Sequence, residues 1–277
     1  MRADVYLFSH GMSESRTKAR ADIESGRLFV NGMPVKRCSF DIKDGDTAEL
    51  RGSGMPFVGR GGLKLLGAFE AFGKDAVKKR CVYLAGEERF EVAGAVCADI
   101  GASTGGFTDC LLSFGAKRVY AVDCGSGQLH EKLRADSRVI NMENFNAREL
   151  SAESLGEKCD AAVMDVSFIS QTLLFPAISR ILKPGGKLIS LIKPQFEAGR
   201  AALGGSGIVR DKKLHALVIR QTAKAAKENG FSLAGLAPSP VAGGDGNREY
   251  LSFYVFSDAP PLTLTNEALK DVTGDGR

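Results

Sequence analysis

Short apolar runs separated by turn residues fill the start of the chain. Residues 2–12 and 13–25 show the spacing of two short helices. The stretch 27–35 then carries two apolar runs around Asn31-Gly32, which is the strongest two-residue hairpin signal. One more short strand follows the hairpin. Residues 1–54 therefore predict a small α+β module.

A longer alternation of apolar strands and helices follows. It predicts a helix at 172–182 and a turn at 183–186. This domain is expected to span 61–258, after a linker at 55–60 and before a C-terminal tail at 259–277. Because the alternation ends in two closely spaced strands, it indicates a doubly wound, Rossmann-like α/β sheet with an antiparallel last strand. Its strands are expected at 93–101, 118–123, 138–142, 160–165, 187–193, 232–240 and 248–256.

Composition favours a globular, intracellular protein. The 277 residues are 44% hydrophobic and 25% charged, which is enough for one large core and a small module. Six scattered cysteines without a C-x-x-C pair are typical of reduced thiols, not of a disulfide frame or a zinc site. Neither a signal-peptide pattern nor an apolar run of bilayer length is present. We therefore expect a cytoplasmic protein with no membrane partner and no metal.

Positive charge is concentrated locally, although the formal net charge is only +4. Residues 13–37 contain six Lys or Arg against three acids, and residues 60–80 contain six against two. Such a basic face can attract phosphate groups even when the whole protein is nearly balanced. For any single cation the alternative is that it only solvates a helix surface. The candidate RNA-binding residues are Arg16, Lys18, Arg20, Lys36, Arg37 and Arg60.

A loop of small residues follows the strand at 93–101. Such a loop lets backbone N–H groups approach a ligand at the start of the next helix. Ser103 stands where a dinucleotide fingerprint needs its second glycine, which disfavours NAD. Asp123, 22 residues beyond Gly101, is placed to accept ribose hydroxyls. This arrangement is typical of S-adenosylmethionine methyltransferases, and the candidate cofactor-binding residues are Asp99, Gly101, Ser103, Thr104, Gly105, Gly106, Asp123, Asn144 and Asp165.

Four charged residues are expected to end or border strands of this domain: Lys64, Asp165, Lys193 and Glu249. Open α/β sheets bind ligands at the carboxyl ends of their strands, so these residues can converge there. Two lysines and two carboxylates can hold a weakly acidic hydroxyl, stabilise its alkoxide and present it to an electrophile. Each alone would be a surface salt bridge, but their shared placement favours catalysis.

The segment DVYLFSHGMSESRTKARADIESGRLFVNGMPV resembles the RNA-binding module named after ribosomal protein S-four. It carries the pattern S-R-x-x-A-x-x-x-I-x-x-G-x-x-x-V-N-G, within a match of about fifty residues. The plain alternative is a helical hairpin packed on a sheet that does not bind RNA.

The wider chain, from Ala3 to about Phe256, is similar to the TlyA (haemolysin A) family. VGRGGLKL, DIGASTGGFTDCLL, AVDCGSGQL, MDVSFIS, IKPQFE, GGSGIVRD and GNREYL occur in that family's order. The family joins an S-four-type module to an FtsJ/RrmJ-like methyltransferase domain and methylates ribose 2′-hydroxyls of ribosomal RNA. The resemblance implies S-adenosylmethionine as cofactor and ribosomal RNA or ribosomal subunits as partner, with cytidine the expected nucleotide. A monomer is expected, with a dimer left open.

The resemblance also implies that the four charged residues are the Lys-Asp-Lys-Glu tetrad of 2′-O-methyltransferases. Lys193 would take the hydroxyl proton, while Lys64 would stabilise the developing alkoxide. Asp165 would orient Lys193 and sit near the methyl sulfonium, and Glu249 would steer Lys64. No metal is required, because the methyl donor is already activated.

Two other functions stay open. One is an RNA-binding protein whose nucleotide domain is non-catalytic or of the NAD type. The other is a pore-forming cytolysin, suggested by the family's haemolysin name and disfavoured by the absence of a spanning segment or strongly amphipathic helix. His215, which follows Arg210-Asp211, is expected to clasp substrate or pack the domain rather than to act in catalysis.

Overall fold

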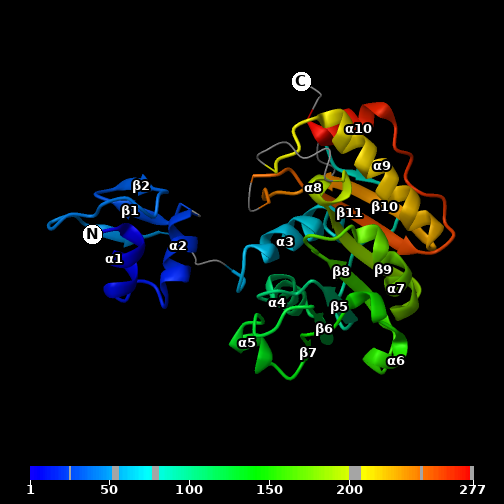
Figure 1. Cartoon of the computed structure of the whole chain (residues 1–277), viewed down its shortest axis with the longest axis horizontal. Helices are drawn as coiled ribbons and strands as arrows, with labels where there is room; N and C mark the ends of the chain where they lie inside the picture. The colour runs from blue at the N-terminus through cyan, green and yellow to red at the C-terminus, as the bar shows by residue number, and fades with distance from the viewer. Residues whose placement is uncertain (25, 52–55, 77–80, 200–206, 244–245, 275–277) are drawn as a thin grey trace. The chain divides into compact units, whose positions relative to one another are not determined.

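The chain forms two compact units, Met1–Pro56 and Phe57–Arg277 (Figure 1). The computed structural model describes residues 1–24, 26–51, 56–76, 81–199, 207–243 and 246–274. The domain boundary expected at residue 54 lies outside the described residues.

In the N-terminal unit, two helices share one apolar core with a three-stranded antiparallel sheet of order β2-β1-β3. Asn31 and Gly32 both have positive φ, which confirms the predicted turn between β1 and β2. The helices are shorter than expected, because Gly11 adopts a left-handed conformation and Ser15 caps α2 by accepting the N–H of Lys18 (3.1 Å). The elements are α1 (Ala3–Ser9), α2 (Arg16–Glu24), β1 (Leu28–Val30), β2 (Met33–Val35) and β3 (Ala48–Leu50).

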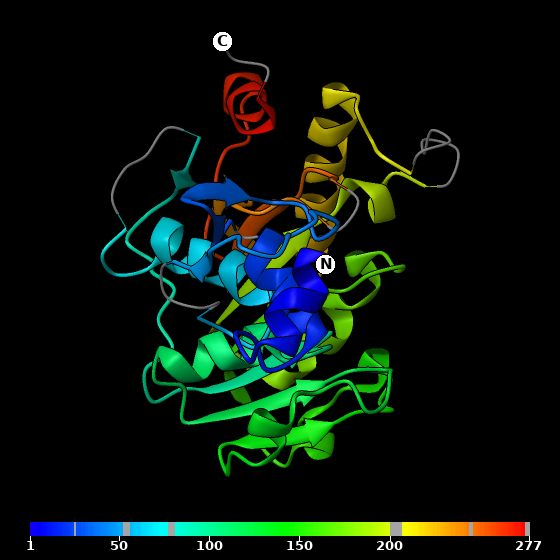
Figure 2. The ribbon, with the colours of Figure 1, turned by 90° about the vertical axis from the view of Figure 1, so that its left-hand side faces the viewer.

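The C-terminal unit is built on an eight-stranded sheet of order β4-β10-β11-β9-β8-β5-β6-β7. In Figure 2 the sheet continues from the green strands of one half to the orange strands β10 and β11. Strands β7, β6, β5, β8 and β9 are parallel, and β11 is antiparallel to β9, as predicted. The strands are β4 (Tyr83–Leu84), β5 (Val96–Ile100), β6 (Arg118–Val122), β7 (Val139–Met142), β8 (Cys159–Met164), β9 (Leu182–Ile192), β10 (Phe231–Pro238) and β11 (Tyr250–Phe256).

Helices cover both faces of this sheet. Because neighbouring strand residues point to opposite faces, one strand can pack against helices on both sides. Val163 and Phe253 pack with α3 and α4, whereas Ala162 and Tyr254 pack with α7. This arrangement is the predicted doubly wound fold. The helices are α3 (Gly61–Phe72), α4 (Gly106–Ser113), α5 (Glu131–Arg134), α6 (Ala152–Leu155), α7 (Phe175–Ile181), α8 (Pro194–Glu197), α9 (Lys212–Glu228) and α10 (Asn266–Thr273), with short 3₁₀ turns η1 (Ala147–Glu149) and η2 (Gln171–Leu173).

Two local expectations were wrong. The helix predicted at 172–182 is divided into η2 and α7, with Pro176 in the first turn of α7, where its missing N–H costs nothing. The turn predicted at 183–186 lies inside β9 as a bulge. Pairing with β8 moves from Cys159–Leu182 to Ala161–Lys187 there, so the turn residues leave the ladder and the strand then resumes.

The expected C-terminal tail instead contains a packed helix. Thr265 caps α10, and Leu269 and Val272 lie in one apolar cluster with Val218 and Ile219 of α9. Leu269 and Val272 are three residues apart and therefore share one face of α10. Among the described residues, no helix is both long and apolar enough to cross a bilayer.

Shortening one buried side chain of α10 tests how much this helix contributes to the free energy of unfolding. Leu269→Ala is expected to lower the free energy of unfolding by about 2–5 kcal/mol, because Leu269 is only 2% exposed. Leu217→Ala on α9 is the matched control, since Leu217 is 49% exposed, and should change the value by less than about 0.5 kcal/mol. Urea unfolding followed by circular dichroism gives both numbers. Equal, small effects of the two substitutions would show that α10 is not part of the folded core.

Candidate active site

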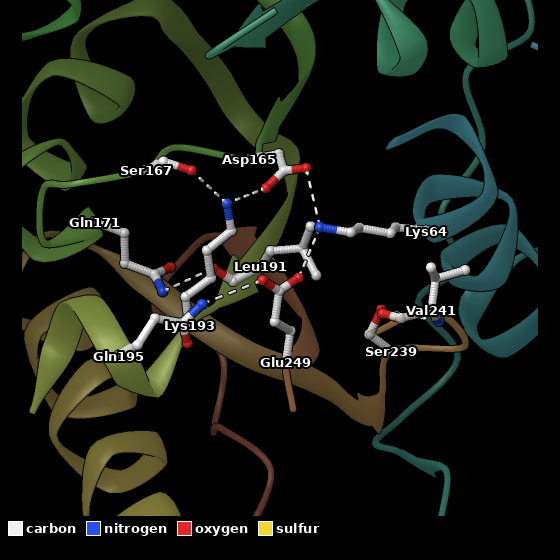
Figure 3. Close-up of polar contacts among 10 residues, drawn as sticks. All are labelled: Lys64, Asp165, Ser167, Gln171, Leu191, Lys193, Gln195, Ser239, Val241 and Glu249. Carbon is white, nitrogen blue, oxygen red and sulfur yellow. Dashed lines mark hydrogen bonds and ion pairs between the residues drawn. The ribbon is translucent and has the colours of Figure 1, made fainter. Parts of the chain in front are cut away.

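Four elements bring the predicted catalytic residues to one edge of the sheet (Figure 3). Asp165 follows β8 and Lys193 follows β9, which are parallel neighbours, so both leave the sheet at the same edge. Glu249 immediately precedes β11, and because β11 is antiparallel its start lies at that edge too. Lys64 was expected beside a strand, but it lies in the first turns of α3.

The start of α3 can approach the sheet edge because glycines line the contact. A Cβ on Gly106, the first residue of α4, would lie only 2.8 Å from the backbone nitrogen of Gly62. The two helices therefore touch through backbone at their N-terminal ends. This close approach places Lys64 over the carboxyl ends of the strands.

The four charged groups alternate in sign. Lys193 Nζ lies 2.6 Å from Asp165 Oδ1, and Lys64 Nζ lies 3.5 Å from Asp165 Oδ2 and 2.7 Å from Glu249 Oε2. The contact of Lys193 with Asp165 is an ion pair that is not aligned as a hydrogen bond. Their side chains are only 3–15% exposed. Charges this buried require opposite charges nearby, and here each has one.

Residues next to the tetrad in sequence complete its surroundings, and the sequence reasoning did not single them out. Lys193 Nζ donates to Ser167 Oγ at 3.0 Å, and Gln195 Nε2 lies 3.4 Å from Glu249 Oε1 (Figure 3). The rings of Phe168 and Phe196 are 5.2 Å apart. Phe168 is 93% exposed and has a φ of 65°, which a bulky residue rarely adopts. Their sequence signal is their place in the motifs MDVSFIS and IKPQFE, two or three positions after Asp165 or Lys193.

A cavity of about 340 Å³ joins the tetrad to the loop of small residues. Of the nine cofactor candidates, it includes Gly101, Ser103, Thr104, Gly106 and Asp165. Its remaining lining residues are Gly61, Lys64, Ala102, Phe107, Ser167, Phe168, Lys193, Gln195, Phe196 and Glu249. The structure thus brings the tetrad and five of the nine cofactor candidates into one concave space.

Alternating left-handed residues shape the loop. Gly101, Ser103 and Gly105 all have positive φ, and a Cβ on Gly105 would overlap the side chain of Leu133. The Ser103 N–H donates to Asp123 Oδ2 at 2.8 Å. The strained serine is therefore held in place by the acid that was expected to contact ribose.

Asp123 and Asn144 lie together beyond the ends of β6 and β7. Asp123 Oδ1 accepts from the N–H of Gly125 (2.7 Å), and the N–H of Asn144 donates to the carbonyl of Gly125 (2.9 Å). Asn144 is exposed and left-handed, with a φ of 57°. Neither side chain lines the cavity around the tetrad.

Asp99 differs from the other cofactor candidates because it has no exposed surface. Thr108 of α4 donates its hydroxyl to Asp99 Oδ2 at 2.7 Å, and burial raises the pKa of Asp99 to about 7. Asp99 is not among the cavity residues. Its contact instead fastens the start of α4 to β5 beneath the loop.

The candidate RNA-binding residues of the N-terminal unit differ in whether they form an ion pair. Arg16 pairs with the buried Asp4 at 3.0 Å, and hydrogen bonds from Arg2 and Arg16 lower the pKa of Asp4 to about 2. Within the described part of the chain, the remaining candidates form no ion pair: Lys18, Arg20, Lys36 and Arg37. Arg60 belongs to the other unit, where it precedes α3 and the cavity residue Gly61.

His215 has a packing role. Its ring is 2% exposed, with Nδ1 2.5 Å from Tyr250 Oη and Nε2 2.9 Å from the carbonyl of Val209. Burial lowers the pKa of His215 and raises that of Tyr250 to about 12. Because Tyr250 follows Glu249, this contact holds the segment before α9 against the start of β11. No group of three or more His, Cys, Asp or Glu side chains suited to a metal ion occurs among the described residues.

Comparison with known proteins identifies two family models in the chain. The model for FtsJ-like methyltransferases matches residues 57–256, and the model for the S4 domain matches residues 1–47. The two matches correspond to the two compact units.

Similar proteins cover nearly the whole chain. Hemolysin A of Brachyspira hyodysenteriae is 40% identical over 256 residues, which cover 92% of this chain and 100% of that protein. The 16S/23S rRNA (cytidine-2′-O)-methyltransferase TlyA of Mycobacterium tuberculosis is 37% identical over 250 residues, 90% of this chain and 87% of that one. A solved hemolysin structure from Streptococcus thermophilus is 38% identical, with a TM-score of 0.74, and the match covers 99% of this chain and 94% of that chain.

The buried Asp99 generates a pH-dependent prediction. In the unfolded chain an aspartate loses its proton near pH 4, whereas folded Asp99 keeps it up to about pH 7. The folded state binds more protons in this window, so the contribution of Asp99 to stability falls as pH rises from about 4 to about 7. Asparagine at position 99 does not titrate, so the Asp99→Asn variant lacks this pH dependence. The free energy of unfolding of Asp99→Asn minus that of wild type should therefore increase from pH 5 to pH 8.

Urea unfolding at several pH values measures this difference. Asp136→Asn is the control, because hydrogen bonding from Arg138 lowers the pKa of Asp136 to about 2, below the tested window. Its difference from wild type should therefore stay constant between pH 5 and 8. A constant difference for Asp99→Asn as well would contradict a protonated Asp99.

Proposed function

The chain belongs to the TlyA (haemolysin A) family of FtsJ-like methyltransferases, and on that premise we propose that it methylates ribose 2′-hydroxyls of ribosomal RNA. This membership confirms the resemblance drawn from the sequence motifs. The observation that carries the proposal is the alternating Lys193–Asp165–Lys64–Glu249 cluster, which shares one cavity with the small-residue loop.

The residues present fit S-adenosylmethionine as methyl donor. The loop from Gly101 to Gly106 offers backbone groups at the start of α4, with glycine where a side chain would overlap its surroundings. Asp123 lies beyond the next strand, within reach of a ribose, and Asn144 is exposed beside it. Asp99 would support the loop from below rather than touch the donor. S-adenosylmethionine supplies a methyl group that is already activated on a sulfonium.

In this proposal the tetrad divides the work on the ribose hydroxyl. Lys193 accepts the hydroxyl proton, with Asp165 and Ser167 holding its amine in place. Lys64 stabilises the negative charge that develops on the oxygen, while Glu249 fixes the amine of Lys64 at 2.7 Å. Phe168 and Phe196 form an aromatic wall beside this centre. Positioning of the two reactants supplies much of the remaining acceleration.

The substrate is proposed from the N-terminal unit and from the relatives. An S4 domain with exposed, unpaired cations at Arg20, Lys36 and Arg37, and a half-buried one at Lys18, suits a phosphate backbone. The Mycobacterium tuberculosis relative is named for cytidine methylation of 16S and 23S rRNA, which supports cytidine as the modified nucleotide. We also propose that the protein acts in the cytoplasm, where ribosomal subunits are found, and as a monomer.

Lys193→Ala should reduce methyl transfer by roughly 10²- to 10⁴-fold, because it removes a positioned proton acceptor. Lys193→Arg should fail as well, since a guanidinium stays protonated. Lys183→Ala, at the exposed far end of β9, is the control and should keep near-normal activity. Transfer of labelled methyl groups to ribosomal RNA or subunits is the measurement. Normal turnover by Lys193→Arg would exclude a proton-accepting role and leave an electrostatic one.

Loss of the unpaired cations should weaken RNA binding. The double substitution Arg20→Ala, Lys36→Ala should lower affinity and reduce the log–log salt slope by about 0.7–0.9 for each lost phosphate contact. Affinity for S-adenosylhomocysteine should not change. Arg138→Ala is the control, because Arg138 lies in the other unit and pairs with Asp136. Unchanged RNA affinity and slope in the double variant would mean that these cations only solvate the surface.

A further inference from the structure

Two short segments leave the sheet directly after catalytic residues, and both line the cavity. The first follows Asp165 and contributes Ser167 and Phe168. The second follows Lys193 and contributes Gln195 and Phe196. The spacing of the two segments therefore determines the surroundings of Lys193, whose amine contacts Asp165 and Ser167 across the gap.

The carboxylate of Glu197 also joins these segments. Glu197, the last residue of α8, accepts the hydroxyl of Ser170 on Oε2 at 2.6 Å and the backbone N–H of Gln171 on Oε1 at 2.8 Å. Ser170 and Gln171 belong to the segment after Asp165. Glu197 itself is not among the cavity residues, so it can affect the reaction only through the groups that it holds.

The far side of this contact is anchored in the sheet. Gln171 is 1% exposed; its Nε2 donates to the carbonyl of Leu191 at 3.2 Å, and its Oε1 accepts the hydroxyl of Ser190. The carbonyl of Ser190 in turn accepts the hydroxyl of Ser252 on β11 at 2.8 Å. The chain of hydrogen bonds thus runs from Glu197 to the two strands that position Lys193 and Glu249.

We propose that Glu197 is a positioning residue, whose carboxylate fastens the segment after Asp165 to the segment after Lys193 and so sets the place of the Lys193 amine. This proposal rests on the proposed function, in which Lys193 accepts the proton of the ribose hydroxyl. Phe168 is consistent with it. A left-handed, exposed phenylalanine persists only where neighbouring contacts hold the backbone, and Ser170 is tied down two residues later.

The chemistry of the contact predicts which substitutions preserve it. A carboxylate accepts both donors, and burial raises the pKa of Glu197 although both hydrogen bonds lower it. A glutamine side chain at position 197 can also form hydrogen bonds with both Ser170 and Gln171. Its amide oxygen can accept the Gln171 N–H while its amide nitrogen donates to Ser170 Oγ. The Ser170 proton then turns to Thr172 Oγ1, which is 2.7 Å away. Alanine breaks both bonds.

The test uses the full chain with Glu197→Ala, Glu197→Gln and Ser170→Ala, and Glu228→Ala as an exposed glutamate control. Single-turnover methyl transfer is measured at saturating ribosomal RNA and S-adenosylmethionine. Glu197→Ala should be slower by about 10- to 100-fold, because displacements of about 1 Å at a reacting group have effects of that size. Glu197→Gln should stay within about threefold of wild type, and Ser170→Ala should lie between them. Affinities for S-adenosylhomocysteine and RNA should change less than about threefold in all four variants.

A wild-type rate for Glu197→Ala would overturn the proposal. So would a loss of rate that merely follows lower cofactor affinity or melting temperature, or a Glu197→Gln variant as slow as Glu197→Ala. Should Glu197→Ala fail to fold, Ser170→Ala decides by the same criteria. Crystal structures of these variants give a readout that does not need activity, because Lys193 Nζ should move away from Asp165 Oδ1 by about 1 Å. An unchanged spacing overturns the positioning role, whereas a wild-type protein without methyl transfer would refute the proposed function alone.

Discussion

The burial of four charges at one sheet edge is the constraint on which the rest of the structure depends. Two lysines and two carboxylates from separate elements lie 3–15% exposed, and removing water from any one of them alone would be costly. They are tolerated because their signs alternate at 2.6–3.5 Å. The antiparallel direction of β11 is part of this solution, since a parallel strand would carry Glu249 to the opposite edge.

A second requirement follows from the origin of Lys64. Three members of the tetrad are delivered by strand ends, but the fourth comes from a helix that must reach over the sheet. Gly62 and Gly106 allow the two helix starts to touch through backbone, so the loop that precedes α4 and the lysine of α3 face the same cavity. The small-residue loop and the proposed catalytic tetrad therefore both depend on this one packing contact.

The sequence predicted those features that depend on local order. Alternating strands and helices gave the doubly wound sheet, and strand ends gave Asp165, Lys193 and Glu249. Features that depend on tertiary partners could not be read in this way. Asp99 is a cofactor candidate by its place near the end of a strand, yet it is buried and bonded to Thr108. Glu197 ends the motif IKPQFE, but nothing in that motif shows that its partners are Ser170 and Gln171. The packed α10 was missed because two apolar positions in a short polar segment become informative only when α9 offers them a surface.

Charge conservation explains why the proposed chemistry suits a tetrad rather than a single base. Lys193 must be neutral when it accepts the ribose proton, which leaves one cation, Lys64, against two carboxylates. This single negative excess matches the positive charge of a sulfonium donor. After transfer the donor is neutral and Lys193 carries the added proton, so the total charge of the buried site is unchanged. Asp165 contacts both lysines and can therefore face the positive charge at the start and at the end of the reaction. Because the site never carries a net charge that lacks a partner, it can stay dry throughout, and hydrogen bonds and ion pairs are strongest in such surroundings.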